Sequence, residues 1–342
     1  MINNTTSHQI HQNNFTVLRW LAAGLVLYGH SFVFLGLPAP SFMSWASLGA
    51  LGVYIFFAIS GYLVAQSWVS DPHPFRFLQR RALRIFPGLV VCITLTVLML
   101  GPLLTKLPIF EYFSHVQTRN YFSNIALYMS YNLPGVFTTN HYPNAINGSL
   151  WSLPAEFSMY FALALVGVAR IPKFGWAIVA LCFVVLAKLW AMETPKMLVI
   201  YRTDFRQVLI CGAYFWVGAA AFKYNISRLF TVSNVLGAVI IWLMLTRWPQ
   251  LFVIASWIIL PFLVIAFGMA HSPILSRFAK YDYSYGIYIY AFPVQQTIAH
   301  FWPHMPLKIY LIVTGIITVI LAGLSWHWIE RPALKLKPPR PI

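Results

Sequence analysis

The sequence predicts an all-α, polytopic integral membrane protein with about ten transmembrane helices in one bundle. Hydrophobic residues form 59% of the 342-residue chain and charged residues only 9%, and the mean hydropathy is +0.70. An ordinary soluble domain carries far more charge. The apolar residues also gather into runs close to the length of about 20 residues that a helix needs to cross a bilayer.

Ten apolar runs are long enough to be predicted as spanning helices. The run at 206–223 gives the weakest signal, because Arg206 stands at its start. No internal repeat is visible, so we expect one transmembrane domain over 15–332, with short tails at 1–14 and 333–342. The predicted helices are 15–36, 46–69, 83–105, 148–169, 174–192, 206–223, 232–247, 250–270, 283–302 and 307–329.

The net charge of +16 would suggest a nucleic-acid partner in a soluble protein, but here it fits basic loops beside a membrane. Fourteen of the 23 lysines and arginines fall on one side of the predicted bundle, and eight fall on the other. The richer side carries Arg76, Arg80, Arg81, Arg84, Arg170, Lys173, Lys223, Arg228, Arg277, Lys280, Arg331, Lys335, Lys337 and Arg340. Because cytoplasmic loops are enriched in basic residues, both termini are expected in the cytoplasm, with the lipid bilayer and no nucleic acid as a partner.

The three cysteines, Cys92, Cys182 and Cys211, all lie in apolar runs. Their spacing does not match that of metal ligands, so we expect small core residues and no metal site. The N-terminus is polar and has no basic n-region. The first apolar run is therefore expected to be a retained helix rather than a cleaved signal peptide.

The first predicted helix carries two ionisable residues, Arg19 and His30, inside its apolar run. Their spacing makes almost three helical turns, so the side chains share one face, about 16 Å apart along the axis. An ionisable residue inside a membrane costs about 2.5–3.5 kcal/mol even on mild insertion scales, which makes both residues functional candidates. A pathway lined by both would run from the cytoplasm into the membrane. The alternative is that Arg19 reaches the interface and His30 bonds a neighbouring helix.

The second predicted helix contains small residues at close spacing, namely Gly49, Gly52, Ser60 and Gly61. Small residues allow two helix backbones to approach each other closely in a membrane. For each of these residues taken alone, helix packing is the favoured interpretation.

A cluster of arginines, Arg80, Arg81 and Arg84, is expected to open the third helix. Arg80 and Arg84 would share a face, and Arg81 would point about 100° away. The enrichment of basic residues on the cytoplasmic side of membrane proteins explains these charges and requires no particular spacing between the arginines. The functional alternative is a phosphate site, because arginine forks suit phosphate oxygens and a helix start favours an anion. With Arg19 on the same side, such a site would suit an anionic cofactor that carries a nucleotide.

Glu156 is the only acidic residue well inside an apolar run, near the start of the fourth predicted helix. If Pro154 takes the first helical position, Glu156 falls at the third, where the helix dipole favours a negative charge. The functional alternative depends on how deep Glu156 lies in the membrane. Entering from the outer side, Glu156 would lie about as deep as His30, and a histidine with a carboxylate forms an acid–base couple.

The last two predicted helices carry weaker signals. The aromatic stretch 281–293 is typical of an interfacial belt with a proline kink. Near the end of the chain, Glu330 and Arg331 are expected to form an interface pair. Pro332 is expected to end the final helix.

Taken together, these motifs resemble acyltransferase family 3, a family of membrane proteins. The resemblance runs from Asn14 to Pro332, in the order expected for the family. One departure is Thr16, which stands where many members have an aspartate three residues before the arginine. The matching residues are Arg19 and His30; Gly49, Gly52, Val53, Phe56, Phe57, Ser60, Gly61, Tyr62 and Leu63; Arg80, Arg81, Arg84, Ile85 and Pro87; Trp151, Ser152, Leu153 and Glu156; Ser284 to Tyr288; and Ile329, Glu330 and Pro332.

The resemblance implies O-acetylation, the transfer of an acyl group, usually acetyl, from cytoplasmic acyl-coenzyme A to a hydroxyl group of a carbohydrate or cell-surface glycan. It also implies a bacterial inner membrane as the location. The expected site residues are His30 and Glu156 for catalysis, Arg19, Arg80, Arg81 and Arg84 for the phosphates of acyl-CoA, and Trp151, Ser152 and Tyr288 for the carbohydrate or glycolipid acceptor. His30 would act as general base or position the thioester, and Glu156 would orient His30 or hold the sugar.

A membrane transporter is the main alternative, in which Arg19, His30 and Glu156 form a relay for a proton or a small solute. Many transporters are built from inverted repeats, which this sequence does not show. The arginine cluster also has no obvious use in a proton relay. A scaffolding membrane protein would leave the arginine, histidine and glutamate inside the apolar runs unexplained.

Overall fold

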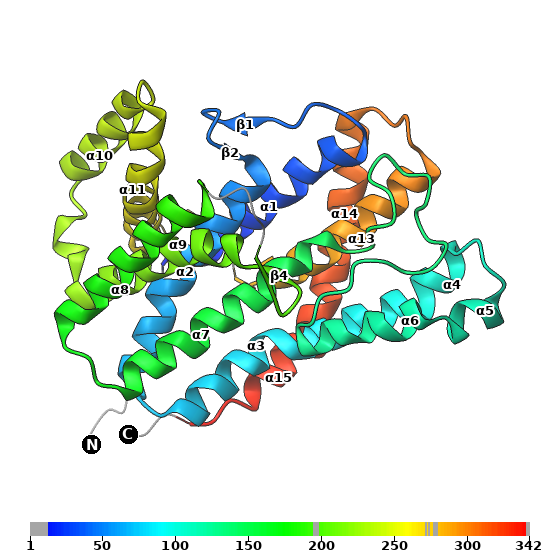
Figure 1. Ribbon diagram of the computed structural model, residues 1–342, viewed down its shortest axis with the longest axis horizontal. Helices are drawn as coiled ribbons and strands as arrows, with labels where there is room; N and C mark the ends of the chain where they lie inside the picture. Colours follow the sequence, from blue (N-terminus) through cyan, green and yellow to red (C-terminus); the bar gives the residue numbers. More distant parts are fainter. Residues whose placement is uncertain (1–12, 194–197, 271, 273, 276–279, 340–342) are drawn as a thin grey trace, which may run out of the picture.

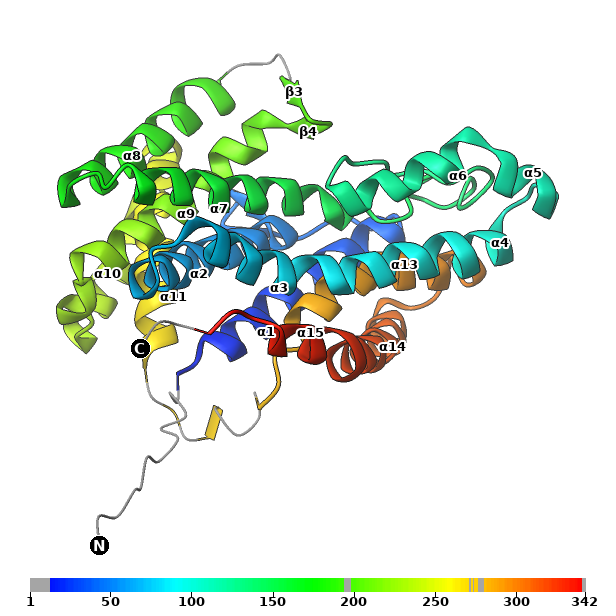
Figure 2. The same ribbon diagram turned by 90° about the horizontal axis from the view of Figure 1, so that it is seen from below.

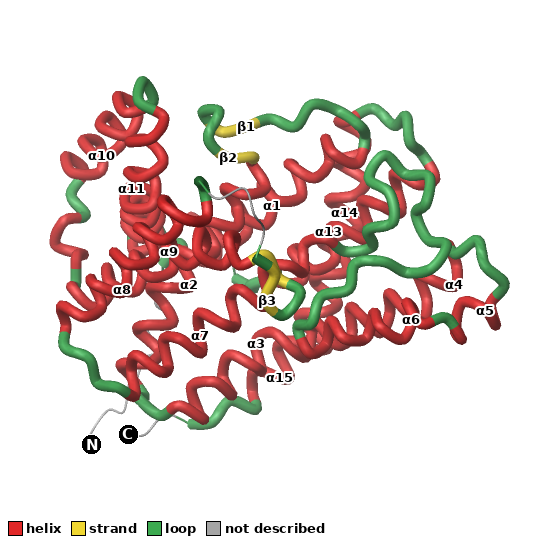
Figure 3. The backbone as a smooth tube through the Cα atoms, viewed as in Figure 1, coloured by secondary structure: helices red, strands yellow, loops and turns green. Residues whose placement is uncertain are grey.

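The computed structural model describes residues 13–193, 198–270, 272, 274–275 and 280–339. Most of the predicted N-terminal tail lies outside these residues, as do Arg277 and Arg340 of the basic side. The described chain is built from helices, and its named strands form two short hairpins (Figure 3). This architecture confirms the predicted all-α membrane fold.

Each of the ten predicted segments contains a helix in the structure. They are α1 (Phe15–Phe34), α2 (Leu48–Ser70), α3 (Pro74–Leu95), α7 (Ser152–Val168), α8 (Lys173–Leu186), α9 (Phe205–Tyr224), α10 (Val232–Leu245), α11 (Pro249–Met269), α13 (Ser284–Phe301) and α14 (Leu307–Ser325). Eight helical stretches of the described chain are long and apolar enough to cross a membrane. The helices α10 and α13 are not among these eight, because α10 has only 14 residues and α13 carries buried polar side chains.

Shorter elements complete the described chain. Three π-helical turns, Thr96–Leu100, Ala187–Ala191 and Trp326–Glu330, prolong α3, α8 and α14. The remaining elements are the 3₁₀ turns Phe122–Ala126, Gly148–Trp151 and Ile226–Leu229; the helices α4 (Gly101–Leu104), α5 (Ile109–Ser114), α6 (Val116–Tyr121) and α15 (Arg331–Lys335); and the strands β1 (Ser41–Phe42), β2 (Ala46–Ser47), β3 (Val199–Ile200) and β4 (Thr203–Asp204). Each hairpin leads directly into a long helix, β2 into α2 and β4 into α9.

Most helix boundaries lie within a few residues of the prediction, and two larger differences bear on the site. The third helix begins at Pro74 rather than at residue 83, because Pro74 suits the first helical turn and the His73 ring accepts a hydrogen bond from the backbone of Arg76. The basic stretch is therefore already helical. At the other end of the chain, Pro332 does not end the helix, since it lies in the first turn of α15, where a missing N–H costs no helical hydrogen bond.

Helix α2 lies at the centre of the bundle and packs most extensively on α9 and α1. Close backbone approach makes this possible. A Cβ atom at Gly52 would overlap the carbonyl oxygen of Ala22 in α1, and a Cβ atom at Gly61 would overlap that of Phe215 in α9. The helix-packing interpretation of these two glycines is confirmed.

The other helices surround this centre (Figure 1). The helices α10 and α11 pair at one edge, and α13 packs against α14 and α1 on the opposite side. Seen from below, α3 lies between α7 and α15 (Figure 2). The turn between α2 and α3 and the connection between α7 and α8 both lie at the lower left of Figure 1. The arginine-rich start of α3 and the basic connection with Arg170 therefore share one end of the bundle.

The aromatic stretch of α13 is inside the protein, which corrects the prediction of an interfacial belt. Tyr285, Tyr288 and Tyr290 are all buried. Burial is possible because the hydroxyl groups have internal partners: Tyr285 donates to the carbonyl of Ile85 at 2.6 Å, and Tyr288 donates to that of Ser149 at 2.7 Å.

Candidate active site

Two cavities enter the bundle toward opposite ends of α1. The first, which we call the arginine cavity, has a volume of about 310 Å³ and is lined by Arg19, Arg81 and Arg84 among others. The second, which we call the histidine cavity, has a volume of about 420 Å³ and is lined by His30 and Trp151 among others. Both volumes fall in the range of small-molecule sites. The two functional candidates of α1 thus open into different spaces.

An acidic residue that the sequence analysis did not single out organises the arginine cavity. Asp282, just before α13, lies 3.0 Å from Nε of Arg19 and 2.7 Å from Nη2 of Arg84. Burial by itself would raise the pKa of this carboxyl group, but the two guanidinium groups outweigh it and lower the pKa to about 2. Asp282 is therefore ionised at neutral pH. A guanidinium group has five N–H donors, so each arginine keeps donors for a ligand in the cavity.

A second carboxylate supports Arg84 from the other side. Glu330 lies 3.7 Å from Nη1 of Arg84 and accepts a hydrogen bond of 2.9 Å from Ser325. The π-helical turn that ends at Glu330 also brings Trp326 to the cavity, with its ring 5.8 Å from the Arg84 guanidinium. The predicted interface pair of Glu330 with Arg331 is thus replaced by a buried contact with Arg84.

Arg80 faces away from the cavity. Its guanidinium group is buried against Asp71, which also pairs with Arg76 through contacts of 3.0 and 2.6 Å. The hydrogen bond from Arg76 and the charge of Arg80 hold the pKa of Asp71 below its usual range. The structure therefore brings Arg81 and Arg84 together in the cavity, one helical turn apart, and not Arg80 with Arg84. Since α3 begins at Pro74, no free helix start contributes to the site.

Glu156 also lies in the arginine cavity. Its carboxylate accepts hydrogen bonds from the hydroxyl groups of Ser60, at 3.2 Å, and of Tyr160. The ring of Tyr160 lies 6.0 Å from the Arg81 guanidinium. Because α7 begins at Ser152, Glu156 is its fifth residue, and the predicted place in the first turn is corrected. Ser60, which was assigned to helix packing, is a polar residue of this cavity.

The histidine cavity has a different lining. The His30 ring contacts the rings of Phe34 and Phe292, at centroid distances of 5.9 and 5.3 Å. Its Nδ1 atom is buried, and it has no hydrogen-bond partner among the described residues. Asp204 and Gln207, from β4 and α9, add polar groups to the same cavity. The imidazole of His30 thus lines a cavity whose wall also carries the side-chain oxygens of Asp204 and Gln207.

The structure does not bring His30 and Glu156 together. Glu156 lines the arginine cavity and His30 the histidine cavity, and the described partners of Glu156 are the two hydroxyl groups given above. The expected acid–base couple is therefore not formed. The membrane depth expected for a residue does not determine the direction in which its side chain points. In the structure, α7 directs the Glu156 side chain toward α2 and α3.

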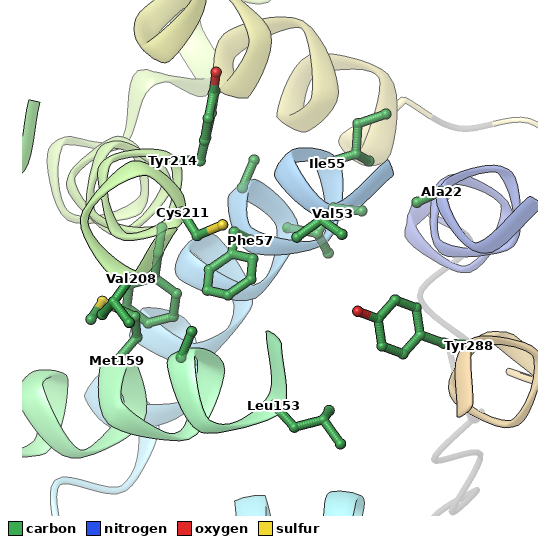
Figure 4. Close-up of a cluster of buried hydrophobic side chains, with 14 of the residues drawn as sticks. Ala22, Val53, Ile55, Phe57, Leu153, Met159, Val208, Cys211, Tyr214 and Tyr288 are labelled. Atoms are coloured by element: carbon green, nitrogen blue, oxygen red, sulfur yellow. The ribbon is translucent and has the colours of Figure 1, made fainter. Parts of the chain in front are cut away.

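Two side chains, Val53 and Tyr288, line both cavities. Figure 4 shows them on either side of a space between α2 and α13, with the Tyr288 hydroxyl pointing toward α2. That hydroxyl contacts Ser152 Oγ at 2.5 Å as well as the Ser149 carbonyl. Of the predicted substrate residues, Tyr288 thus lies at the boundary, Ser152 beside it in the arginine cavity, and Trp151 in the histidine cavity.

Comparisons with known proteins give matches over nearly the whole chain. A family model described as an acyltransferase domain matches residues 12–327. The O-acetyl transferase of Shigella phage Sf6 is 33% identical over 338 residues, covering 97% of this chain and 99% of that protein. Nodulation protein 10 of Rhizobium leguminosarum bv. viciae is 30% identical over 364 residues, covering 96% and 94% of the two chains. No solved structure matches the chain.

Proposed function

The chain belongs to acyltransferase family 3, and we propose that this membrane O-acetyltransferase takes its acyl group from acyl-coenzyme A and passes it to a hydroxyl group of a carbohydrate. The observation that carries the proposal is the pair of cavities that share Val53 and Tyr288 in their linings. One cavity suits a polyanionic donor, and the other suits a polar, uncharged acceptor. The family assignment favours this enzyme over the transporter alternative.

The donor is assigned to the arginine cavity because of its charge. Four basic residues line it, namely Arg19, Arg81, Arg84 and Lys337. Asp282 and Glu156 line the same cavity and Glu330 contacts Arg84, so three carboxylates offset most but not all of the positive charge. Arginine forks form charge-assisted hydrogen bonds with phosphate oxygens. Because the arginine-rich start of α3 and the basic connection between α7 and α8 lie at this end of the bundle, we assign it to the cytoplasm, where coenzyme A would enter. The location proposed is the bacterial inner membrane, with both termini cytoplasmic.

The acceptor is assigned to the histidine cavity. Trp151 offers an aromatic face, and Asp204 and Gln207 offer hydrogen-bonding groups. A few placed polar groups beside an aromatic wall are typical of sites that orient a small polar ligand. A sugar has apolar faces for the ring and hydroxyl groups for the polar residues, so a carbohydrate or glycolipid is the acceptor class we propose.

In the proposed reaction, His30 acts as general base. The imidazole takes the proton from an acceptor hydroxyl while that oxygen attacks the carbonyl carbon of the thioester. The new C–O bond forms, the C–S bond breaks, and the leaving thiolate takes the proton back from His30. Glu156, on the donor side, positions Arg81 through Tyr160 rather than pairing with His30.

The test measures free coenzyme A released from acetyl-CoA by the purified protein in nanodiscs, with and without a crude glycan extract from the host. We expect release that depends on the extract. His30→Ala should lower it by about 100-fold or more, the usual contribution of a general base. The matched control is His304→Ala, because His304 is an exposed histidine outside both cavities.

Two results would contradict the proposal. If a folded His30→Ala protein retains activity, His30 is not the base. If the wild type binds no acyl-CoA and releases no coenzyme A with any extract, the donor assignment is wrong. A glycan that carries the acetyl group afterwards, identified by mass spectrometry, would name the acceptor.

A further inference from the structure

The boundary between the two cavities carries an inference about donor selectivity. We propose that Val53 and Tyr288 form a filter that limits the width of the acyl group reaching the acceptor, so that acetyl passes and branched acyl groups do not. The inference rests on the proposed function, because it requires the donor in the arginine cavity and the acceptor in the histidine cavity. Among the lining residues of the two cavities, these two are shared.

The reaction geometry requires passage between these side chains. Arg81 and Arg84, which hold the phosphates in our assignment, lie in one cavity, and His30 lies in the other. The thioester carbonyl must reach the acceptor hydroxyl beside His30 while the phosphates stay with the arginines. The acyl group, at the far end of the donor, therefore enters the boundary first. Its width decides whether the carbonyl arrives.

Tyr288 is a rigid side of this filter. Its hydroxyl is held by Ser149 and Ser152, at 2.7 and 2.5 Å, and its ring meets the ring of Phe56 edge-on at 5.8 Å. Only 6% of the residue is exposed. A ring fixed at both its hydroxyl and its edge does not move aside for a wider group.

Val53 is the opposite side, and its backbone is equally fixed. It follows Gly52, where α2 meets the Ala22 carbonyl of α1 so closely that a Cβ atom would not fit. Its β-branched side chain has a strong χ1 preference inside a helix. In Figure 4 Val53 and Phe57 of α2 lie on the side toward which the Tyr288 hydroxyl points. An acetyl group is no wider than the linear arm that carries it, whereas an isobutyryl group has one branch more.

The test compares isobutyryl-CoA with acetyl-CoA as donors for the wild type and Val53→Ala in nanodiscs with the same glycan extract. The kcat/KM ratio of isobutyryl to acetyl should rise by about tenfold or more, because one methylene in a fitted pocket changes discrimination by roughly 10–200-fold. Val64→Ala and Val33→Ala are matched controls. Val64 lines only the arginine cavity and Val33 only the histidine cavity, and their ratios should stay within about threefold of wild type.

A second variant tests the filter by narrowing it. Val53→Phe should abolish acetyl transfer while the purified protein still binds coenzyme A, measured by equilibrium dialysis, because the arginines of the donor cavity are untouched. Transfer at the wild-type rate by a folded Val53→Phe protein would overturn the proposal.

The outcomes separate this inference from the function on which it rests. A ratio that does not change in Val53→Ala, or that changes equally in all three valine variants, overturns the filter and leaves the acetyltransferase intact. A wild type that transfers neither acyl group overturns both. A ratio that rises in Val53→Ala alone supports the filter.

Discussion

The two carboxylates Asp71 and Asp282 each hold two arginines, but they do so in different surroundings. Asp71 pairs with Arg76 and Arg80, and its side chain is fully buried. Asp282 pairs with Arg19 and Arg84, and its side chain is 15% exposed at the wall of a cavity. The arginines around Asp71 are therefore closed to a ligand, whereas those around Asp282 remain accessible from the cavity.

This contrast divides a single sequence motif into two roles. Arg80 and Arg84 are one helical turn apart, yet Arg80 stabilises the connection between α2 and α3, and Arg84 lines the donor cavity. A charged side chain that is enclosed by its partners contributes only to the fold. A charged side chain at the wall of a cavity can also bind a ligand. The predictions below test this division.

The largest effect is expected from Arg84→Gln. Loss of the guanidinium should raise the KM for acetyl-CoA by about 100-fold, because a hydrogen bond to a charged group contributes roughly 1.5–3 kcal/mol. Steady-state kinetics in nanodiscs would measure it, with thermal unfolding as a control for folding. An unchanged KM would show that Arg84 has the same structural role as Arg80.

The reverse result is expected for Arg80→Gln. This change leaves buried Asp71 without one of its two partners, so the thermal unfolding midpoint should fall. The KM for acetyl-CoA of the protein that remains folded should stay within about threefold of wild type, since Arg80 does not line the cavity. A large rise in KM with unchanged stability would reverse the assignment of the two arginines.

A smaller effect should appear as a pH dependence of stability. The pKa of Asp282 is about 2 in the folded protein, below its ordinary value of 3.8. The ionised group therefore stabilises the fold fully above about pH 5, and up to about 2 kcal/mol is lost as the pH falls from 4 to 2.

The measurement compares wild type with Asp282→Asn by denaturant unfolding across this range. The difference in unfolding free energy should be constant between pH 5 and 8 and should shrink below pH 4. A difference that does not depend on pH would mean that Asp282 is not held ionised by its arginines.

The smallest effect is expected from Thr16→Asp. The hydroxyl of Thr16 accepts a hydrogen bond of 3.4 Å from Arg19, at the position where many family members have an aspartate. Asp282 already neutralises Arg19, so the single change should alter the KM for acetyl-CoA by less than about fivefold, as for a weak ion pair. In the Asp282→Asn background the same change should recover part of the unfolding free energy lost with Asp282, because the introduced carboxylate would again give Arg19 an acidic partner. No recovery would show that Thr16 and Asp282 do not share a role.

Hydropathy was sufficient to predict the ten helices, because apolar runs long enough to span a bilayer occur mainly as membrane helices. It was insufficient for the ends of α3 and α14. Both ends are polar helical turns whose charges are paired inside the protein, as Arg80 is with Asp71 and Arg84 is with Glu330. A polar turn resembles a loop in sequence until its partners are known.

The candidate site was predicted in part. The arginines of the cavity and His30 stood out as charges inside or beside apolar runs, but their partners came from distant segments. Asp282 carried a usable signal, since the chain has only seven acidic residues and a buried arginine requires one of them. Ser60 gave no signal of its own, because a small residue in a membrane helix fits packing equally well.

The ion pair between Arg19 and Asp282 also bears on how the protein is made. Arg19 emerges from the ribosome in the first helix, whereas Asp282 precedes the second-last long helix, α13. Through most of membrane insertion the guanidinium has no access to this carboxylate, and an unpaired charge inside a bilayer is unfavourable. The pair can therefore close only after the chain has been synthesised as far as α13, so α1 reaches its final contacts late in assembly.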